Sequence, residues 1–69
     1  MKNHIRVERA RMRITQEELA VRVQVSRQAI NAIEGGKYNL STMLALKIAQ
    51  VFGTTVDALF ELEPSDWKT

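Results

Sequence analysis

Two helix start signals close together in the chain constrain its fold more than any other feature. Thr15 can accept a hydrogen bond from a first-turn N–H, and Glu18 three residues later completes a capping box. Ser26 offers the same kind of cap to a second helix. Apolar residues follow each cap at helical spacing, Leu19, Ala20 and Val23 after the first and Ala29, Ile30 and Ile33 after the second. The stretch 16–34 therefore predicts two short amphipathic helices joined by a tight turn.

The other face of the second of these helices carries Arg27, Gln28 and Asn31. Arg and Gln can form bidentate hydrogen bonds to guanine and adenine edges in the major groove of DNA. Arg27 and Gln28 stand in the first turn, the end that points at the bases in a helix-turn-helix. A solvated polar helix face is the simpler alternative, but the pattern favours a set that reads bases.

Further segments extend this pattern along the chain. The matching segments are Thr15–Ala20, Val25–Asn31, Ile33–Asn39 and Leu44–Ala49, followed by Leu59 and Phe60. In this order and spacing they resemble the helix-turn-helix of phage repressors and Cro proteins, the XRE family. The resemblance implies an all-α, lambda-repressor-like domain of five helices over residues 1–69, with its helix-turn-helix at 16–34. It also implies a protein that binds duplex DNA and regulates transcription, most simply as a repressor.

The resemblance assigns roles to residues outside the second helix. An ion pair between Arg9 and Glu34 would hold the first helix against the third. The polar loop after Gly35 would lie along the phosphate backbone. The expected phosphate contacts are Gln16, Ser26, Lys37, Tyr38 and Asn39. One departure from the family is Gln24, which stands where glycine is common and should cost about 1 kcal/mol in a left-handed conformation.

The flanking segments read as three further helices and a tail. An amphipathic helix is predicted over His4–Arg13, with Asn3 as a cap and with Ile5, Val7, Ala10, Met12 and Ile14 as its apolar positions. Ser41 should cap a largely buried helix over Thr42–Phe52, and Thr55 a short fifth helix. The tail after Phe60 is not helical in pattern. It would form either a short strand pairing with the N-terminus, as in some short relatives, or a frayed end.

Composition narrows the class of protein. Residues 1–13 have a charge balance of +4 and residues 54–69 one of −3, an asymmetry suited to a protein with one side facing a polyanion. The chain has no Cys and a single His, and no metal-binding or phosphate-cradling motif is present. We therefore expect no enzyme activity, no metal, no cofactor and no small-molecule ligand. No apolar run is long enough to cross a membrane, so a soluble cytoplasmic protein is expected.

A domain this small reads few base pairs, which predicts a two-fold homodimer on a palindromic operator. The expected dimerisation region is 55–69, through the apolar side chains Val56, Leu59, Phe60, Leu62 and Trp67. The competing hypothesis is a protein-interaction module, such as an antitoxin or a regulator that acts through a protein partner. Exposed aromatic and aliphatic residues would mark such a surface. Polar Arg27, Gln28 and Asn31 favour DNA instead.

Overall fold

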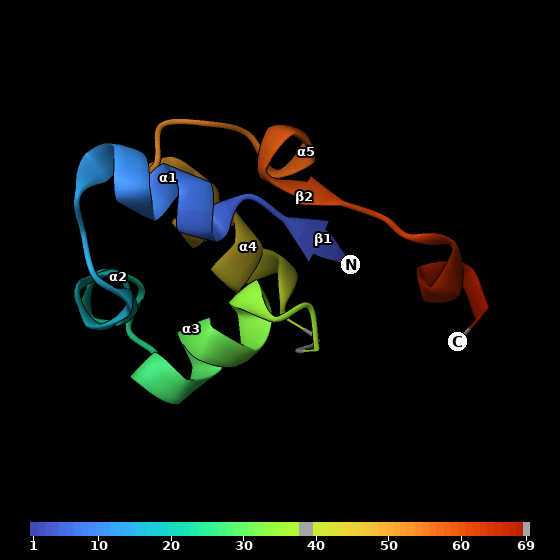
Figure 1. Cartoon of the computed structure of the whole chain (residues 1–69), viewed down its shortest axis with the longest axis horizontal. Helices are drawn as coiled ribbons and strands as arrows, with labels where there is room; N and C mark the ends of the chain where they lie inside the picture. Colours follow the sequence, from blue (N-terminus) through green and yellow to red (C-terminus); the bar gives the residue numbers. More distant parts are fainter. Residues whose placement is uncertain (38–39, 69) are drawn as a thin grey trace.

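The computed structural model describes residues 1–37 and 40–68, and within them the chain forms five α-helices and a two-stranded antiparallel sheet (Figure 1). The elements in order are β1 (Lys2–Asn3), α1 (Ile5–Met12), α2 (Gln16–Val23), α3 (Arg27–Glu34), α4 (Thr42–Val51), α5 (Val56–Leu59), β2 (Phe60–Glu61) and a 3-10 helix (Pro64–Lys68). The predicted all-α architecture of five helices is confirmed, and of the two alternatives left open for the tail the short terminal strand is the one formed. No helix of the described part is long and apolar enough to cross a membrane.

Local caps start four of the five helices, as predicted. The side-chain oxygens of Thr15, Ser26, Ser41 and Thr55 each accept the main-chain N–H three residues later, at 3.0 to 3.1 Å. The Glu18 side chain in turn accepts a hydrogen bond from the Thr15 N–H, which completes the capping box. Helix α1 differs, because the side chain of its N-cap His4 makes no capping hydrogen bond. Asn3 serves instead from one position earlier, its Oδ1 accepting the Ile5 N–H at 3.2 Å.

The turns between helices require left-handed backbone at two residues that are not glycine. Gln24 ends α2 with φ of 64°, the strained conformation expected there, and Arg13 ends α1 with φ of 57°. Gly36 after α3 has φ of 75°, and a Cβ at this position would lie 2.9 Å from the Met1 carbonyl oxygen. Gly36 is therefore required by both its dihedral angle and the close approach of the N-terminus.

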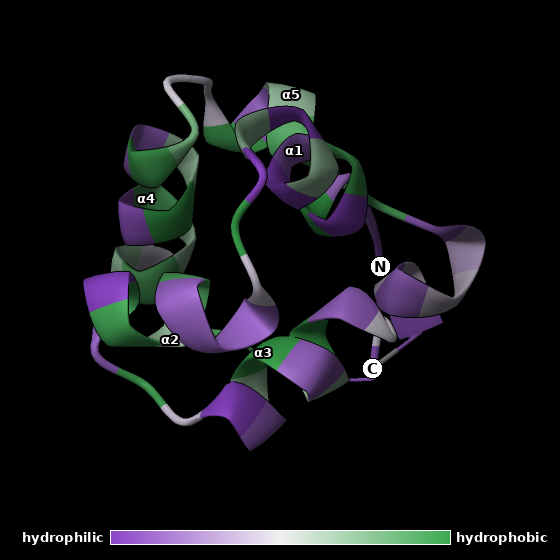
Figure 2. Ribbon diagram, turned by 60° about the vertical axis from the view of Figure 1, so that its left-hand side comes forward, coloured by the Kyte–Doolittle hydropathy of each residue, from purple (hydrophilic) through white to green (hydrophobic). Residues whose placement is uncertain are grey.

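The core lies at the centre of the five helices. Its fully buried side chains are Ile5, Leu19, Val23, Ile30, Ile33, Ile48 and Leu59. Two predictions of burial were wrong. Val7, expected on the apolar side of α1, is 63% exposed. Met43 and Leu46 on α4, the helix expected to be largely buried, are 67% and 56% exposed, because none of the described residues packs over the outer sides of these helices. In Figure 2 most of the α4 ribbon is green, which reflects its apolar sequence.

The tail takes the strand alternative and then becomes helical. Lys2 pairs with Glu61 and Asn3 with Phe60 in the antiparallel sheet. The prediction that the remaining tail is not helical was wrong, because Pro64–Lys68 forms a 3-10 helix whose first turn is closed by Asp66 Oδ2 accepting the Glu63 N–H at 2.7 Å. That hydrogen bond, with the nearby positive N-terminus, lowers the pKa of Asp66.

Two of the side chains expected at a dimer interface belong to the core of the chain itself. Leu59 is 1% exposed and Phe60 is 8% exposed. The strand pairing of β2 turns Phe60 inward, and α5 directs Leu59 onto the same core. That part of the interface prediction was wrong. Val56 is half-buried, and Leu62 and Trp67 are 60% and 76% exposed.

Candidate nucleic-acid interface

The outer face of α3 gathers the three polar residues singled out for base recognition. Ile30 and Ile33, at 0% and 1% exposure, fasten one side of the helix to the core. Arg27, Gln28 and Asn31 are exposed on the other side. Ser26 caps the helix through its Oγ, so its hydroxyl oxygen already serves Ala29. The result is a short helix with a buried apolar side and an exposed polar side.

The loop that follows α3 is only partly within the described structure. Lys37 is exposed directly after the left-handed Gly36. Tyr38 and Asn39 lie outside the described residues, so their predicted contacts stay predictions. Lys37 is placed at the C-terminal end of α3 and Arg27 at its N-terminal end, so positive side chains stand at both ends of the polar face.

The ion pair between Arg9 and Glu34 joins α1 to the end of α3. Arg9 Nε donates to Glu34 Oε2 at 2.7 Å, and Nη2 donates to Oε1 at 3.2 Å. Arg9 Nη1 also donates to the Ile14 carbonyl oxygen at 3.1 Å. The Glu34 side chain is 1% exposed and that of Arg9 is 17% exposed. This bidentate pair of charge-assisted hydrogen bonds, largely shielded from solvent, fixes the orientation of α1 relative to α3.

Glu34 remains a carboxylate in this setting. Burial by itself favours the neutral acid, but the hydrogen bonds from Arg9 and Gln16 outweigh burial and lower the pKa of Glu34 below its ordinary value of 4.5. Arg6 adds a weaker contribution, its Nε lying 3.5 Å from Oε1 on a side chain that is 77% exposed. At neutral pH, Glu34 therefore accepts hydrogen bonds and donates none.

Gln16, the first residue of α2, is already engaged inside the protein. Its Nε2 donates to Glu34 Oε1 at 3.2 Å and to Asn31 Oδ1 at 3.3 Å. The Gln16 side-chain nitrogen thus donates to two partners within the protein, and the predicted contact of Gln16 with phosphate stays a prediction. The main-chain N–H of Gln16 has no acceptor within its own helix, because it lies in the first turn.

One basic residue at this surface escaped the sequence reasoning. An open hollow of about 540 Å³ is lined by Arg9, Arg13, Ile14, Thr15, Gln16, Glu17 and Arg27. Arg13 reaches this hollow because its left-handed backbone turns the chain from α1 into α2. The basic run Arg9, Arg11, Arg13 was the available signal, but nothing local showed which member would lie beside α3.

Metal-binding groupings are not found in the part of the chain that the structure describes. No three His, Cys, Asp or Glu residues of 1–37 and 40–68 lie together in a way that could hold a metal ion. The described surface offers exposed polar side chains that can donate or accept hydrogen bonds, together with positive charge.

Comparison with known proteins gives the family. The helix-turn-helix family HTH_3 matches residues 5–59. An HTH-type transcriptional regulator of Methanocaldococcus jannaschii is 47% identical over 66 residues, covering 96% of this chain and all of the relative. One from Archaeoglobus fulgidus is 50% identical over 60 residues, 87% of this chain and 86% of the relative, and YgzD of Bacillus subtilis is 44% identical over 63 residues, 91% and 96%. The chain therefore belongs to the XRE-type helix-turn-helix family.

Proposed function

We propose that this chain is a sequence-specific regulator of transcription that places α3 in the major groove of duplex DNA. The observation that carries the proposal is the two-sided character of α3, with Ile30 and Ile33 in the core and Arg27, Gln28 and Asn31 exposed. The family is one of DNA-binding regulators rather than enzymes, and the relatives carry the name of HTH-type transcriptional regulators. Arg27 and Gln28 would read base edges from the first turn of the helix.

Phosphate contacts would surround this helix and set its register. Lys37 would hold the backbone at one end of α3, and Arg13 in the hollow beside α2 would hold it at the other. The cap Ser26 and the loop residues Tyr38 and Asn39 complete the proposed set. Such contacts supply affinity that falls with salt and carry no sequence information themselves.

The proposed working unit is a homodimer on a palindromic operator. Two recognition helices about 34 Å apart would read successive turns of one face of the DNA. Doubling the number of base pairs read raises the specificity to what a genome demands. If its operator overlaps a promoter, such a dimer would block the polymerase by binding alone, which is why we propose repression.

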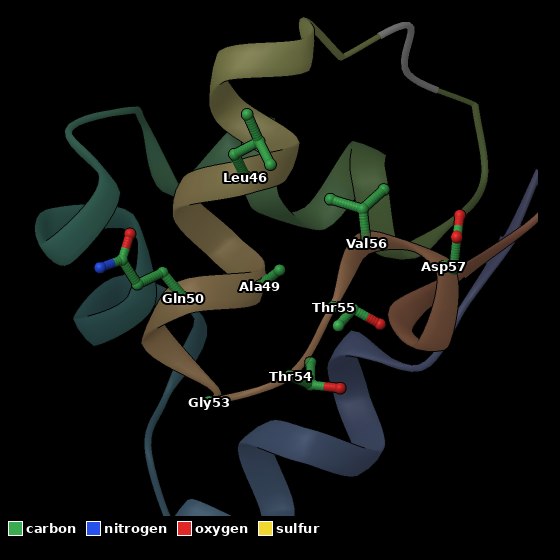
Figure 3. A pocket seen from close by; sticks show the side chains of 8 residues that line it. All are labelled: Leu46, Ala49, Gln50, Gly53, Thr54, Thr55, Val56 and Asp57. Carbon is green, nitrogen blue, oxygen red and sulfur yellow. The ribbon is translucent and has the colours of Figure 1, made fainter.

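The groove between α4 and α5 is the surface we propose for the second copy. Leu46 projects from α4 and Val56 from the start of α5, with Ala49 between them (Figure 3). The groove measures about 610 Å³, and Leu46 is 56% exposed. Figure 1 shows α5 and α3 at opposite edges of the molecule, so a partner here leaves α3 free. Acidic Asp57 on the groove wall would keep this side away from phosphates.

Selection of bound fragments from random duplex DNA tests the proposed function. Arg27→Ala should relax the preference at one base pair, a loss of about 1–3 kcal/mol of discrimination. Lys37→Ala should weaken all sequences alike and lower the salt dependence by about one counterion. If no sequence is enriched, or if both variants have the same sequence profile, the proposed division of roles is wrong.

Sedimentation equilibrium tests the dimer. Leu46→Glu should shift the protein to monomer and weaken binding to a two-fold operator. Val7→Glu is the matched control, because Val7 is 63% exposed on α1 and lines no part of the groove. A wild-type monomer at high micromolar concentration that binds a single half-site with full affinity would contradict the dimer.

A further inference from the structure

A chain of hydrogen bonds runs from α1 to the base-reading face of α3. Arg9 donates to Glu34 at 2.7 and 3.2 Å. Gln16 Nε2 then donates to Glu34 Oε1 at 3.2 Å and to Asn31 Oδ1 at 3.3 Å. Asn31 is exposed, whereas the Glu34 side chain is 1% exposed. Gln16 thus connects exposed Asn31 to the buried carboxylate of Glu34.

The direction of every bond in this chain follows from chemistry. An arginine can only donate, and a carboxylate can only accept. Glu34 therefore forces the amide nitrogen of Gln16, and not its oxygen, to face it. The same nitrogen lies within hydrogen-bond distance of Asn31 and brings a second N–H. Asn31 must meet it with its oxygen, which leaves the NH2 group of Asn31 turned away from Gln16.

We infer that Asn31 is held as a donor and reads a base edge that only accepts, guanine before all others. The inference rests on the proposed function, in which α3 lies in the major groove. Guanine presents two acceptors there, N7 and O6, and thymine presents one, O4. Adenine would require a donor and an acceptor side by side, as a freely turning asparagine provides. Here the Asn31 oxygen is occupied, and its NH2 group would face the adenine amino group.

Gln16 acts in this scheme as a positioning residue. It touches Asn31 and fixes which end of the amide faces the DNA, without itself reading a base. A side chain that only donates would preserve that orientation, so Gln16→Lys should keep the preference. A side chain of similar size without polar groups would release it, so Gln16→Leu should let Asn31 turn by half a rotation and accept adenine. Both variants leave the pair between Arg9 and Glu34 in place.

The experiment starts from an operator selected from random duplex DNA with the wild-type chain. Asn31→Ala identifies the base pair that Asn31 contacts, as the position whose preference disappears. Affinities are then measured for all four base pairs at this position. We expect guanine to be preferred over adenine by about 5- to 150-fold. Replacing that guanine by 7-deazaguanine, which lacks the N7 acceptor, should remove a large part of the preference.

Variants of Gln16 and Asn31 test whether the orientation of the Asn31 amide causes this preference. Gln16→Leu should reduce the discrimination between guanine and adenine towards unity, and Gln16→Lys should retain it. Asn31→Asp keeps the bond from Gln16 but turns an acceptor outward, so the preference should move to cytosine or adenine, whose amino groups donate. A wild-type preference for adenine at the Asn31 position, or unchanged discrimination in Gln16→Leu, would overturn the inference while sequence-specific binding stands. The proposed function itself fails only if no operator is enriched.

Discussion

Removing the arginine of the buried ion pair should destabilise the whole domain. In Arg9→Met the aliphatic stem is kept, but Glu34 loses hydrogen bonds of 2.7 and 3.2 Å and the Ile14 carbonyl loses one of 3.1 Å. The Glu34 carboxylate, at 1% exposure, then has little access to water. An uncompensated buried charge is among the few mechanisms by which one substitution costs several kcal/mol.

The structure places the magnitude near the lower end of the range for buried pairs. Breaking a buried pair by removing one partner costs about 3–5 kcal/mol. Gln16 still donates to Glu34, Arg6 remains at 3.5 Å, and Arg9 is itself 17% exposed. We therefore expect a loss of about 3 kcal/mol, out of a total stability of roughly 3–10 kcal/mol for a domain of this size. The midpoint of thermal unfolding should fall by about 12–24 °C.

Urea unfolding followed by circular dichroism measures this loss, and two further variants interpret it. Arg6→Ala is the control, because its exposed side chain should contribute less than about 1 kcal/mol to the same carboxylate. The double variant Arg9→Met with Glu34→Leu should be less damaging than the sum of the single variants, by about 2 kcal/mol. Additivity of the two single losses to within about 0.5 kcal/mol would show that the pair contributes nothing and would refute the reasoning.

Three other predictions follow from the same geometry. Burial would raise the pKa of Glu34, but its hydrogen bonds lower it. The contribution of Glu34 to stability is therefore complete above about pH 4.5 and is lost as the pH falls through the lowered pKa. Urea unfolding between pH 7 and pH 3 should show this loss of stability, and Glu34→Gln should make stability less dependent on pH over that range. Arg13→Gly should relieve the strain of φ at 57° and leave the free energy of unfolding equal or higher by up to about 1 kcal/mol. The same variant should bind DNA more weakly and lower the salt slope of binding by about one, and an unchanged affinity would show that Arg13 does not contact phosphate. Leu59→Ala should cost about 2–5 kcal/mol in thermal unfolding because the side chain is 1% exposed, whereas Leu62→Ala should stay within about 0.5 kcal/mol; equal losses would contradict the placement of the tail.

The helix boundaries could be predicted from the sequence because they depend on neighbours in the chain. A cap such as Thr15, Ser26, Ser41 or Thr55 acts on an N–H three residues away, so residue type and spacing are sufficient. The same reason explains the polar side of α3, since its helical period separates buried Ile30 from exposed neighbours.

Predictions about burial failed where they depended on other elements. Helix α4 is apolar enough to be surrounded, yet Met43 and Leu46 stay exposed because no element among residues 1–37 and 40–68 covers that side. Leu59 and Phe60 were expected to contact a partner, but both lie at inward-facing positions where α5 meets β2 and are buried in the core of the chain itself. Hydropathy shows which side chains favour burial, but not which element or which molecule buries them.

The local sequence by itself determined the helices, their caps and the side of α3 that stays polar, because these properties act over a few residues. The family resemblance anticipated the pairing of Arg9 with Glu34, which composition and periodicity alone do not show. Only the tertiary structure decided that Gln16 bridges Glu34 and Asn31, that Arg13 turns towards α3, and that the chain ends pair in a sheet. These contacts join residues far apart in the sequence, and hydrogen bonds form only where the packing of the core brings donor and acceptor within about 3 Å.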